Sequence, residues 1–190
     1  MPPKILAFAG SLRADSFNKK LIRIGVEGAR AAGADVTLID LRDFPMPIYD
    51  GDIEAAGFPE NALKVKKLFL DHHGLLISAP EYNRSVTGVL KNTIDWVSRS
   101  APGEKPLSAY AEKVAGLLSA SPGPVGGMRG LMHLREILTH IKVLVIPDQV
   151  SVSKANEAFN PDGSLKDAKQ AAAAHAVGRV LAETMAKLRA

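Results

Sequence analysis

Residues 4–18 read KILAFAGSLRADSFN, and the transition within them decides the fold. The apolar run at 5–9 is short, unbroken and free of alternation, as expected of a strand buried on both faces of a parallel sheet. Gly10 begins a polar loop, and from Asn18 to Ala32 apolar residues recur at helical spacing. A strand that leads through a short loop into a helix is the first unit of a doubly wound α/β fold.

The same unit recurs along the chain. Further apolar runs lie at 36–41, 75–79, 114–119 and 143–146, and helical spacing is found at 60–73, 88–99 and 125–141. Strict alternation across five strands predicts a doubly wound sheet with helices on both faces. Ser164 is the predicted N-cap of an alanine-rich closing helix at 168–189. Because no linker or internal repeat interrupts the pattern, we expect residues 1–190 to form a single domain.

Composition narrows the chemistry. The chain has 190 residues, enough for one substantial core, and no cysteine. Disulfides, thiolate nucleophiles and iron–sulfur clusters are therefore excluded, and redox chemistry would need an added cofactor. No apolar run approaches the ~20 residues that span a bilayer, and the N-terminus lacks the apolar core of a signal peptide. We expect a cytoplasmic protein with no membrane span.

The charge favours small anionic ligands. Lys and Arg number 24 against 20 Asp and Glu, giving a formal net charge of +4. A mild positive field attracts phosphates and NAD(P)H. The basic residues are scattered rather than clustered, so nucleic-acid binding is the weaker alternative and we expect no such partner. No metal site is expected, since the adjacent His72 and His73 point in different directions on a helix and the other histidines are dispersed.

The loop after the first strand has the composition of a phosphate site. It contains two hydroxyls, an amide and a guanidinium, from Ser11, Ser16, Asn18 and Arg13, and it runs into a helix N-terminus. Hydroxyl and backbone donors, a helix dipole and a two-pronged arginine are what a phosphate requires. Neither Gly-x-Gly-x-x-Gly nor a P-loop is present, so the loop suits a mononucleotide phosphate held without metal. The alternative is that Ser16 or Asn18 only caps the helix.

A second polar loop follows the third strand, where residues 78–85 read SAPEYNRS. A flat aromatic cofactor needs an apolar wall and a few polar groups in its ring plane. Pro80, Tyr82 and Asn83 have this composition. Both loops follow buried parallel strands, so they must meet at the same edge of the sheet.

Four stretches resemble the NADPH-dependent FMN reductase family, which includes bacterial quinone, chromate and azo-compound reductases. They are GSLRADSFN at 10–18, PEYNRS at 80–85, GVLKNTIDW at 88–96 and SPGPVGG at 121–127. They occur in family order, each after the expected strand. The resemblance extends over essentially the whole chain and implies a flavodoxin-like fold with strand order 2-1-3-4-5.

The resemblance also implies a non-covalent FMN site. Carried over by position, its residues are Ser11, Arg13, Ser16, Phe17 and Asn18 around the phosphate, Pro80, Glu81, Tyr82 and Asn83 along the isoalloxazine, and Ser121 beside the ring. No catalytic side chain is expected, because FMN carries the chemistry. Thr87 departs from the family, which commonly has proline there, and losing that ring is expected to loosen the turn. The roles of Arg84 and Arg129 stay open.

The implied activity is oxidation of NADPH or NADH followed by reduction of a small acceptor, in two half-reactions that share one face of FMN. Quinones are the expected acceptors, with ferric complexes, chromate and azo compounds in the same class. Family members are homodimers or homotetramers, and Trp96 on the helix at 88–99 serves either core packing or pairing of subunits. A flavodoxin-type electron carrier and a regulatory FMN-binding protein are the alternatives, although such carriers are usually strongly acidic. A hydrolase is disfavoured, since Ser11 lacks the Gly-x-Ser-x-Gly elbow.

Overall fold

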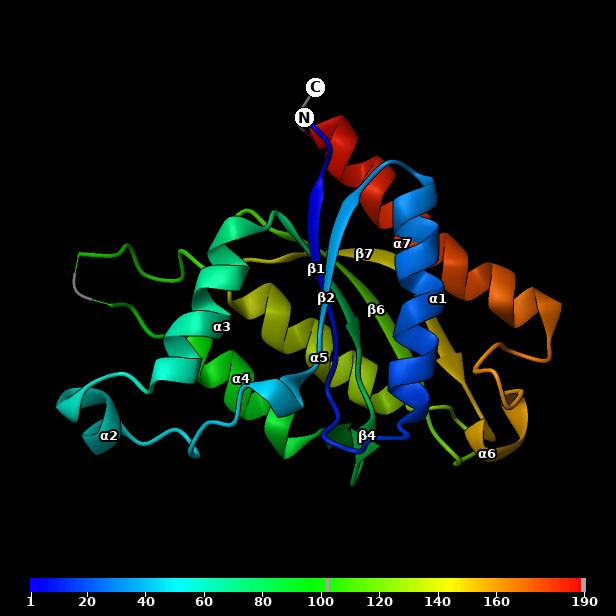
Figure 1. Cartoon of the computed structure of the whole chain (residues 1–190), viewed down its shortest axis with the longest axis horizontal. Helices are drawn as coiled ribbons and strands as arrows, with labels where there is room; N and C mark the ends of the chain where they lie inside the picture. The colour runs from blue at the N-terminus through cyan, green and yellow to red at the C-terminus, as the bar shows by residue number, and fades with distance from the viewer. Residues whose placement is uncertain (102, 189–190) are drawn as a thin grey trace.

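The computed structural model describes residues 1–101 and 103–188 and contains a five-stranded sheet in the order β2-β1-β3-β6-β7. All four pairings are parallel, so the predicted 2-1-3-4-5 order is confirmed (Figure 1). The strands are β1 Lys4–Ala9, β2 Asp35–Ile39, β3 Gly74–Ser78, β6 Val114–Ala120 and β7 Leu144–Val152.

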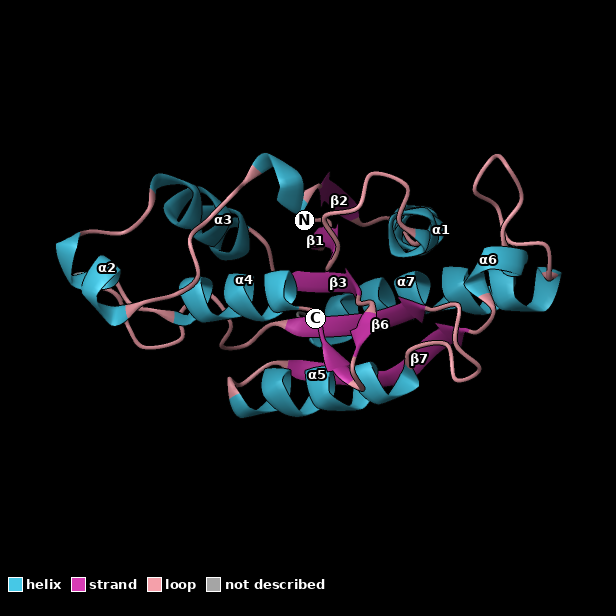
Figure 2. Ribbon diagram, turned by 90° about the horizontal axis from the view of Figure 1, so that it is seen from below, coloured by secondary structure: helices cyan, strands magenta, loops and turns pink. Residues whose placement is uncertain are grey.

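Helices cover both faces of this sheet, as predicted (Figure 2). One face carries α1 Phe17–Ala31 and α7 Ala168–Leu188, and the other carries α3 Glu60–Asp71, α4 Gly88–Ser98 and α5 Met128–His140. Shorter elements are the 3-10 turn η1 Leu41–Asp43, and the helices α2 Gly51–Ala56 and α6 Ala155–Ala158. Among the described residues, no helix is both long and apolar enough to cross a bilayer.

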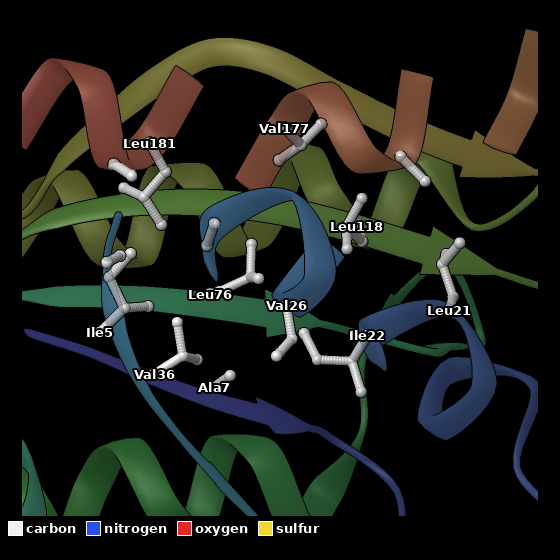
Figure 3. Close-up of a cluster of buried hydrophobic side chains, with 14 of the residues drawn as sticks. Ile5, Ala7, Leu21, Ile22, Val26, Val36, Leu76, Leu118, Val177 and Leu181 are labelled. Carbon is white, nitrogen blue, oxygen red and sulfur yellow. The ribbon is translucent and has the colours of Figure 1, made fainter. Parts of the chain in front are cut away.

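The inner strand β1 lies between β2 and β3, and its two buried faces explain why its sequence shows no alternation. Ile5 and Ala7 belong to the core beneath α1 and α7, whereas Leu6 and Phe8 belong to the core beneath the opposite helices. Figure 3 shows Ile5 and Ala7 among the side chains of α1 and α7. Successive side chains of a strand point to opposite faces, so a strand with two buried faces must be apolar throughout.

The fifth strand is longer than predicted. The apolar pattern indicated only 143–146, but β7 continues to Val152. A register shift in its pairing with β6 accommodates the polar residues, and Arg135 donates to Val145 O, Ile146 O and Gln149 Oε1 across the irregularity. An edge strand has one neighbour, and polar residues are tolerated there.

The last helix begins at residue 168 as predicted, but its N-cap was predicted wrongly. Asp167, and not Ser164, caps α7, because its Oδ1 accepts from the N–H groups of Lys169 at 2.8 Å and Gln170 at 3.3 Å. Ser164 lies in the preceding turn, where its N–H and hydroxyl donate to Asp162. The predicted last residue of the helix, Arg189, lies outside the described residues.

Two residues with open roles are structural. Trp96 is fully buried and its Nε1 donates to Pro47 O at 2.8 Å, so it serves the core of its own protomer. His72 is buried as well, with Nδ1 2.6 Å from Leu68 O and Nε2 2.8 Å from Thr37 Oγ1. Nδ1 therefore bonds a carbonyl of α3, the helix that His72 ends, and Nε2 links this helix end to β2.

Candidate functional site

The loop between β1 and α1 is folded by its own hydroxyls. Ser16 is the N-cap of α1 and accepts from the N–H of Asn18 at 3.3 Å, and Ser11 Oγ accepts from the N–H of Arg13 at 3.3 Å. Each hydroxyl uses a lone pair for these bonds and keeps its hydrogen for another acceptor. No acidic residue lies in the first turn of α1, so the positive end of its dipole is open to an anion.

The amide of Asn18 holds three loops together. Its Nδ2 donates to Ala120 O at 2.8 Å, and its Oδ1 accepts from Ala120 N–H at 3.0 Å and from Ser78 Oγ at 2.9 Å. Asn18 is 3% exposed. This side chain therefore positions the ends of β3 and β6 against the start of α1.

The loop after β3 contains a small hairpin that the sequence did not predict. Its strands are β4 Glu81–Tyr82 and β5 Ser85–Val86, joined by Asn83 and Arg84 with φ angles of 50° and 68°. Two-residue hairpin turns require positive φ, which asparagine tolerates better than arginine. The hairpin leaves Tyr82 54% exposed.

Glu81 ties this hairpin to α5. Its Oε2 accepts from the N–H of Gly130 at 3.0 Å, in the first turn of the helix. Gly127 has a φ of 88°, and a Cβ there would lie 2.0 Å from Ser119 Oγ, so glycine is required. The helix consequently begins at Met128, later than the predicted residue 125. This bond directs the Glu81 side chain toward α5.

Thr87, where the family commonly has proline, is buried and hydrogen-bonded on both sides of its hydroxyl. Its hydroxyl donates to Gly10 O at 2.7 Å and accepts from the N–H of Leu90 at 3.3 Å, and the residue is 1% exposed. Proline at this position would have no hydroxyl to donate to Gly10. Thr87 therefore links the end of the hairpin directly to the loop after β1, a contact that the sequence did not predict.

One cleft at the carboxyl ends of β1, β3 and β6 gathers all the predicted cofactor residues except Asn83. It is lined by Ser11, Arg13, Ser16, Phe17, Asn18, Pro80, Glu81, Tyr82 and Ser121, together with Ala120 and Pro122. Asn83 lies at the hairpin tip and is not part of this lining. We did not predict Pro122 from the sequence, although it directly follows Ser121 and lies, like Ser121, in the loop after a buried strand.

The charges around the cleft suit a phosphate. Asp15, the acid of the loop, lies 2.7 Å from Lys20 Nζ. The hydrogen bond from Lys20 lowers the pKa of Asp15, and the charge of Arg13 acts in the same direction. Lys20 forms the ion pair with Asp15, and within residues 1–101 and 103–188 no ion pair engages the Arg13 guanidinium. Hydroxyl donors and a guanidinium beside Pro80, Tyr82 and Phe17 form a donor set that fits a phosphate joined to a flat ring system.

The family model described as NADPH-dependent FMN reductase matches residues 3–157. The chain belongs to this family. An NAD(P)H-dependent FMN reductase of Pseudomonas aeruginosa is 37% identical over 167 residues, covering 87% of this chain and 86% of the relative. A quinone reductase of Escherichia coli is 35% identical over 144 residues, covering 75% of this chain and 73% of the relative. The protein is an oxidoreductase of the NAD(P)H-dependent FMN and quinone reductase type.

Solved structures agree with the family. The flavoenzyme NAD(P)H:(acceptor) oxidoreductase FerB of Paracoccus denitrificans superposes with a TM-score of 0.79 at 27% identity, over 97% of this chain and 98% of that chain. An archaeal flavodoxin superposes with a TM-score of 0.64 at 10% identity, over 95% of this chain and 97% of that chain. At that identity the second likeness shows the fold alone, which is flavodoxin-like.

A segment just beyond the family match supports the loop between β1 and α1. Phe159 stacks on Phe17 of the cleft, with ring centroids 5.8 Å apart and planes at 11°. Lys20 Nζ lies 5.6 Å from the centroid of the Phe17 ring. Phe159 is 8% exposed and bridges to Leu165. The start of α1 is therefore held by aromatic packing as well as by its cap.

Proposed function

We propose that this cleft binds FMN non-covalently and that the protein passes electrons from NADPH or NADH to a small acceptor. The carrying observation is that three loops, distant in sequence, bring hydroxyl groups and the Arg13 guanidinium into one cleft beside Pro80 and Tyr82. The proposed FMN residues are Ser11, Arg13, Ser16, Phe17, Asn18, Pro80, Glu81, Tyr82, Asn83 and Ser121. A single domain over residues 1–190 is part of the same proposal.

Each half of the cleft has a separate task. Arg13 and the hydroxyls of Ser11 and Ser16 bind the phosphate, and the start of α1 adds its dipole. Pro80 and Tyr82 form the apolar wall against the ring and exclude water from one of its faces. FMN, when bound, supplies the capacity to accept a hydride and to pass electrons on.

Three of these residues act mainly by position. The side chain of Asn18 bonds to the end of β6, and that of Glu81 bonds to α5. These two residues therefore keep the cleft in shape and offer their backbone groups to FMN. Ser121 Oγ accepts from the N–H of Gly123 at 3.2 Å and keeps its hydrogen for the ring edge. No residue in this scheme needs to exchange a proton.

Quinones are the proposed acceptors. This rests on the E. coli quinone reductase and on a 2-hydroxy-1,4-benzoquinone reductase of Burkholderia sp, which is 36% identical over 77% of this chain and 75% of the relative. Ferric complexes, chromate and azo compounds belong to the wider acceptor class. We also propose a homodimer or homotetramer, on a surface that excludes the buried Trp96.

The test begins with cofactor binding. Arg13→Ala removes a charge-assisted phosphate contact, which is worth about 1.5–3 kcal/mol and corresponds to roughly 10- to 150-fold weaker FMN binding. Titration of apoprotein with FMN measures this loss. Arg179→Ala is the control, because Arg179 pairs with Glu183 on α7 and its removal changes the net charge equally. Unchanged FMN affinity in Arg13→Ala would contradict the phosphate assignment.

The reaction itself needs a second measurement. In the absence of oxygen, the purified protein with FMN is expected to consume NADPH beyond one equivalent per FMN only when a quinone is present. If NADPH loss does not depend on the acceptor, the protein is an electron carrier or a regulatory FMN-binding protein instead.

A further inference from the structure

The loop between β1 and α1 contains an acid next to the proposed phosphate residues. Within GSLRADSFN at 10–18, Asp15 is the single acidic residue, and it lies between Arg13 and Ser16, which both line the cleft. A phosphate monoester carries nearly two negative charges at neutral pH. An ionised carboxylate in the same loop repels this phosphate and competes with it for cations. Phosphate binding is therefore favoured by a cation that compensates Asp15.

Lys20, at the end of the first turn of α1, supplies that cation. Its Nζ lies 2.7 Å from Asp15 Oδ1. The hydrogen bond from Lys20 is the main reason that the pKa of Asp15 lies below its ordinary value, and the charge of Arg13 contributes as well. Arg13 thus also acts on Asp15, and it is the cation that remains for this carboxylate when Lys20 is absent.

The Lys20 side chain is held in place by its surroundings. Its Nζ lies 5.6 Å from the centroid of the Phe17 ring. On another side, a Cβ on Gly163 would lie 3.6 Å from Lys20 Cγ, so the turn that ends at Gly163 lies against the lysine stem. The Lys20 side chain is 21% exposed, whereas that of Asp15 is 77% exposed. Because the lysine is already ordered by packing, the ion pair costs less side-chain entropy than one between two free side chains.

The neighbouring Lys19 pairs with a different acid. Its Nζ lies 2.5 Å from Asp40 Oδ2, at the end of β2. Like Lys20, Lys19 lies outside the lining of the cleft. Each of the two lysines therefore has its own carboxylate, and Lys20 is the one that pairs with the acid beside Arg13.

We infer that Lys20 is a positioning residue for phosphate binding, because it holds Asp15 away from Arg13 and keeps the Arg13 guanidinium available to the phosphate of FMN. Lys20 acts through Asp15 and not by contact with the phosphate. The inference rests on the proposed function, since it takes the Arg13 side of the cleft as the phosphate site. It names the residue pair that decides how strongly the cleft selects FMN over riboflavin, which has the same ring system and no phosphate.

The first experiment measures the dissociation constants of the apoprotein for FMN and for riboflavin. Lys20→Met keeps an apolar stem against Phe17 and removes the charge. It is expected to weaken FMN binding roughly two- to fivefold, the range of a solvent-exposed ion pair, and to leave riboflavin binding unchanged. An equal loss of affinity for both flavins would show a packing role and overturn the inference.

Lys19→Met is the matched control. It changes the net charge equally and removes the ion pair of the adjacent lysine with Asp40. Its affinity for FMN should stay close to that of the wild type. The same loss of FMN affinity in both lysine variants would show a general effect of charge, which contradicts a specific role of Lys20.

The second experiment is a double-mutant cycle with Asp15→Asn. Asparagine has no charge, so it does not compete with the phosphate for Arg13, and Lys20 is then dispensable. Asp15→Asn alone should bind FMN at least as tightly as the wild type, and the double variant Lys20→Met/Asp15→Asn should regain the wild-type affinity. If the double variant binds FMN as weakly as Lys20→Met, Lys20 acts on the phosphate directly and the inference is wrong.

Ionic strength provides a third readout. Interactions between exposed charges are screened beyond about 10 Å at 0.1 M salt and beyond about 3 Å at 1 M. The difference in FMN affinity between the wild type and Lys20→Met should therefore shrink as the salt concentration rises. A difference that stays constant up to 1 M salt would point to packing and overturn the inference.

Failure of the proposed function would give a different pattern. If Arg13→Ala weakens FMN binding and Lys20→Met does not, the phosphate site stands and the role of Lys20 is refuted. If the wild type binds FMN no more tightly than riboflavin, the cleft has no phosphate site, and the proposed function and the role of Lys20 are both refuted.

Discussion

Ser78 Oγ donates a hydrogen bond of 2.9 Å to Asn18 Oδ1, and both side chains are buried. This contact joins the end of β3 to the first turn of α1. The same amide bonds both backbone groups of Ala120 at the end of β6. One side chain thus sets the spacing between the start of α1 and the ends of β3 and β6, which all border the cleft.

Asn18→Ala should therefore lower both stability and FMN affinity. The substitution leaves Ser78 and both backbone groups of Ala120 without their buried partner, and each unsatisfied group costs about 1–3 kcal/mol. Ser78→Ala removes one bond only and should cost about 1 kcal/mol. Urea unfolding and FMN titration measure the two effects. Full retention of FMN affinity in Asn18→Ala would show that the loops are spaced by other contacts.

Arg84→Gly should stabilise the protein. Arg84 has a φ of 68°, and the left-handed conformation costs a non-glycine residue roughly 1–2 kcal/mol. Part of this gain is offset by the greater freedom of glycine in the unfolded chain, which leaves a net gain of about 0.5–1 kcal/mol. Arg84→Ala keeps the strain and serves as the control in urea unfolding. Equal stability of the two variants would argue against strain at the hairpin tip.

Gly178→Ala should separate α1 from α7. A Cβ at Gly178 would lie 1.8 Å from Gly25 O, and this backbone oxygen cannot rotate away. Overpacking of this kind costs about 1–3 kcal/mol. Gly51→Ala is the matched control, since no atom lies within 4 Å of its added Cβ, and alanine there should be neutral or slightly stabilising. Thermal unfolding of both variants checks the difference, and a similar Tm in the two would contradict close helix packing.

Asp40→Asn should lower stability at neutral pH but not in strong acid. The folded-state pKa of Asp40 is below its unfolded value of about 3.9, so the carboxylate stabilises the fold above that pH. The contribution is lost as the pH falls through the lower, folded-state pKa. For a partly exposed pair it amounts to about 0.2–1 kcal/mol. Urea unfolding at several pH values measures it, and a wild-type advantage that persists below the folded-state pKa would rule out the carboxylate as its source.

Phe159→Ala should weaken FMN binding although Phe159 lies outside the cleft lining. The loss of its ring removes the stacking partner of Phe17, and aromatic pairs contribute about 0.5–1.5 kcal/mol beyond the burial of their surface. Phe159→Tyr keeps the ring and should restore the affinity. Phe69→Leu, in the opposite core, should lower stability without changing the FMN titration. Loss of FMN affinity in Phe69→Leu to the same extent would indicate a general effect of stability.

The sequence by itself determined the sheet and the set of residues at its edge. Apolar runs and helical spacing are local properties, and parallel strands connected by helices have few possible arrangements. Polar loops that follow buried strands must lie at one edge, which is why residues near Ser11, Pro80 and Ser121 were expected together and line one cleft.

Only the tertiary structure decided what those residues contact. Asn18 had the signature of a cap or a phosphate ligand, but its amide is used by Ser78 and Ala120, which are 60 and 102 residues away. Threonine stands at position 87 where the family commonly has proline, and its hydroxyl donates to Gly10 O, 77 residues away in the sequence. Hydrogen-bond partners of this kind depend on how the chain folds back on itself. A local sequence pattern contains no information about these distant partners. The apolar residues whose burial drives folding, in contrast, can be identified within each segment.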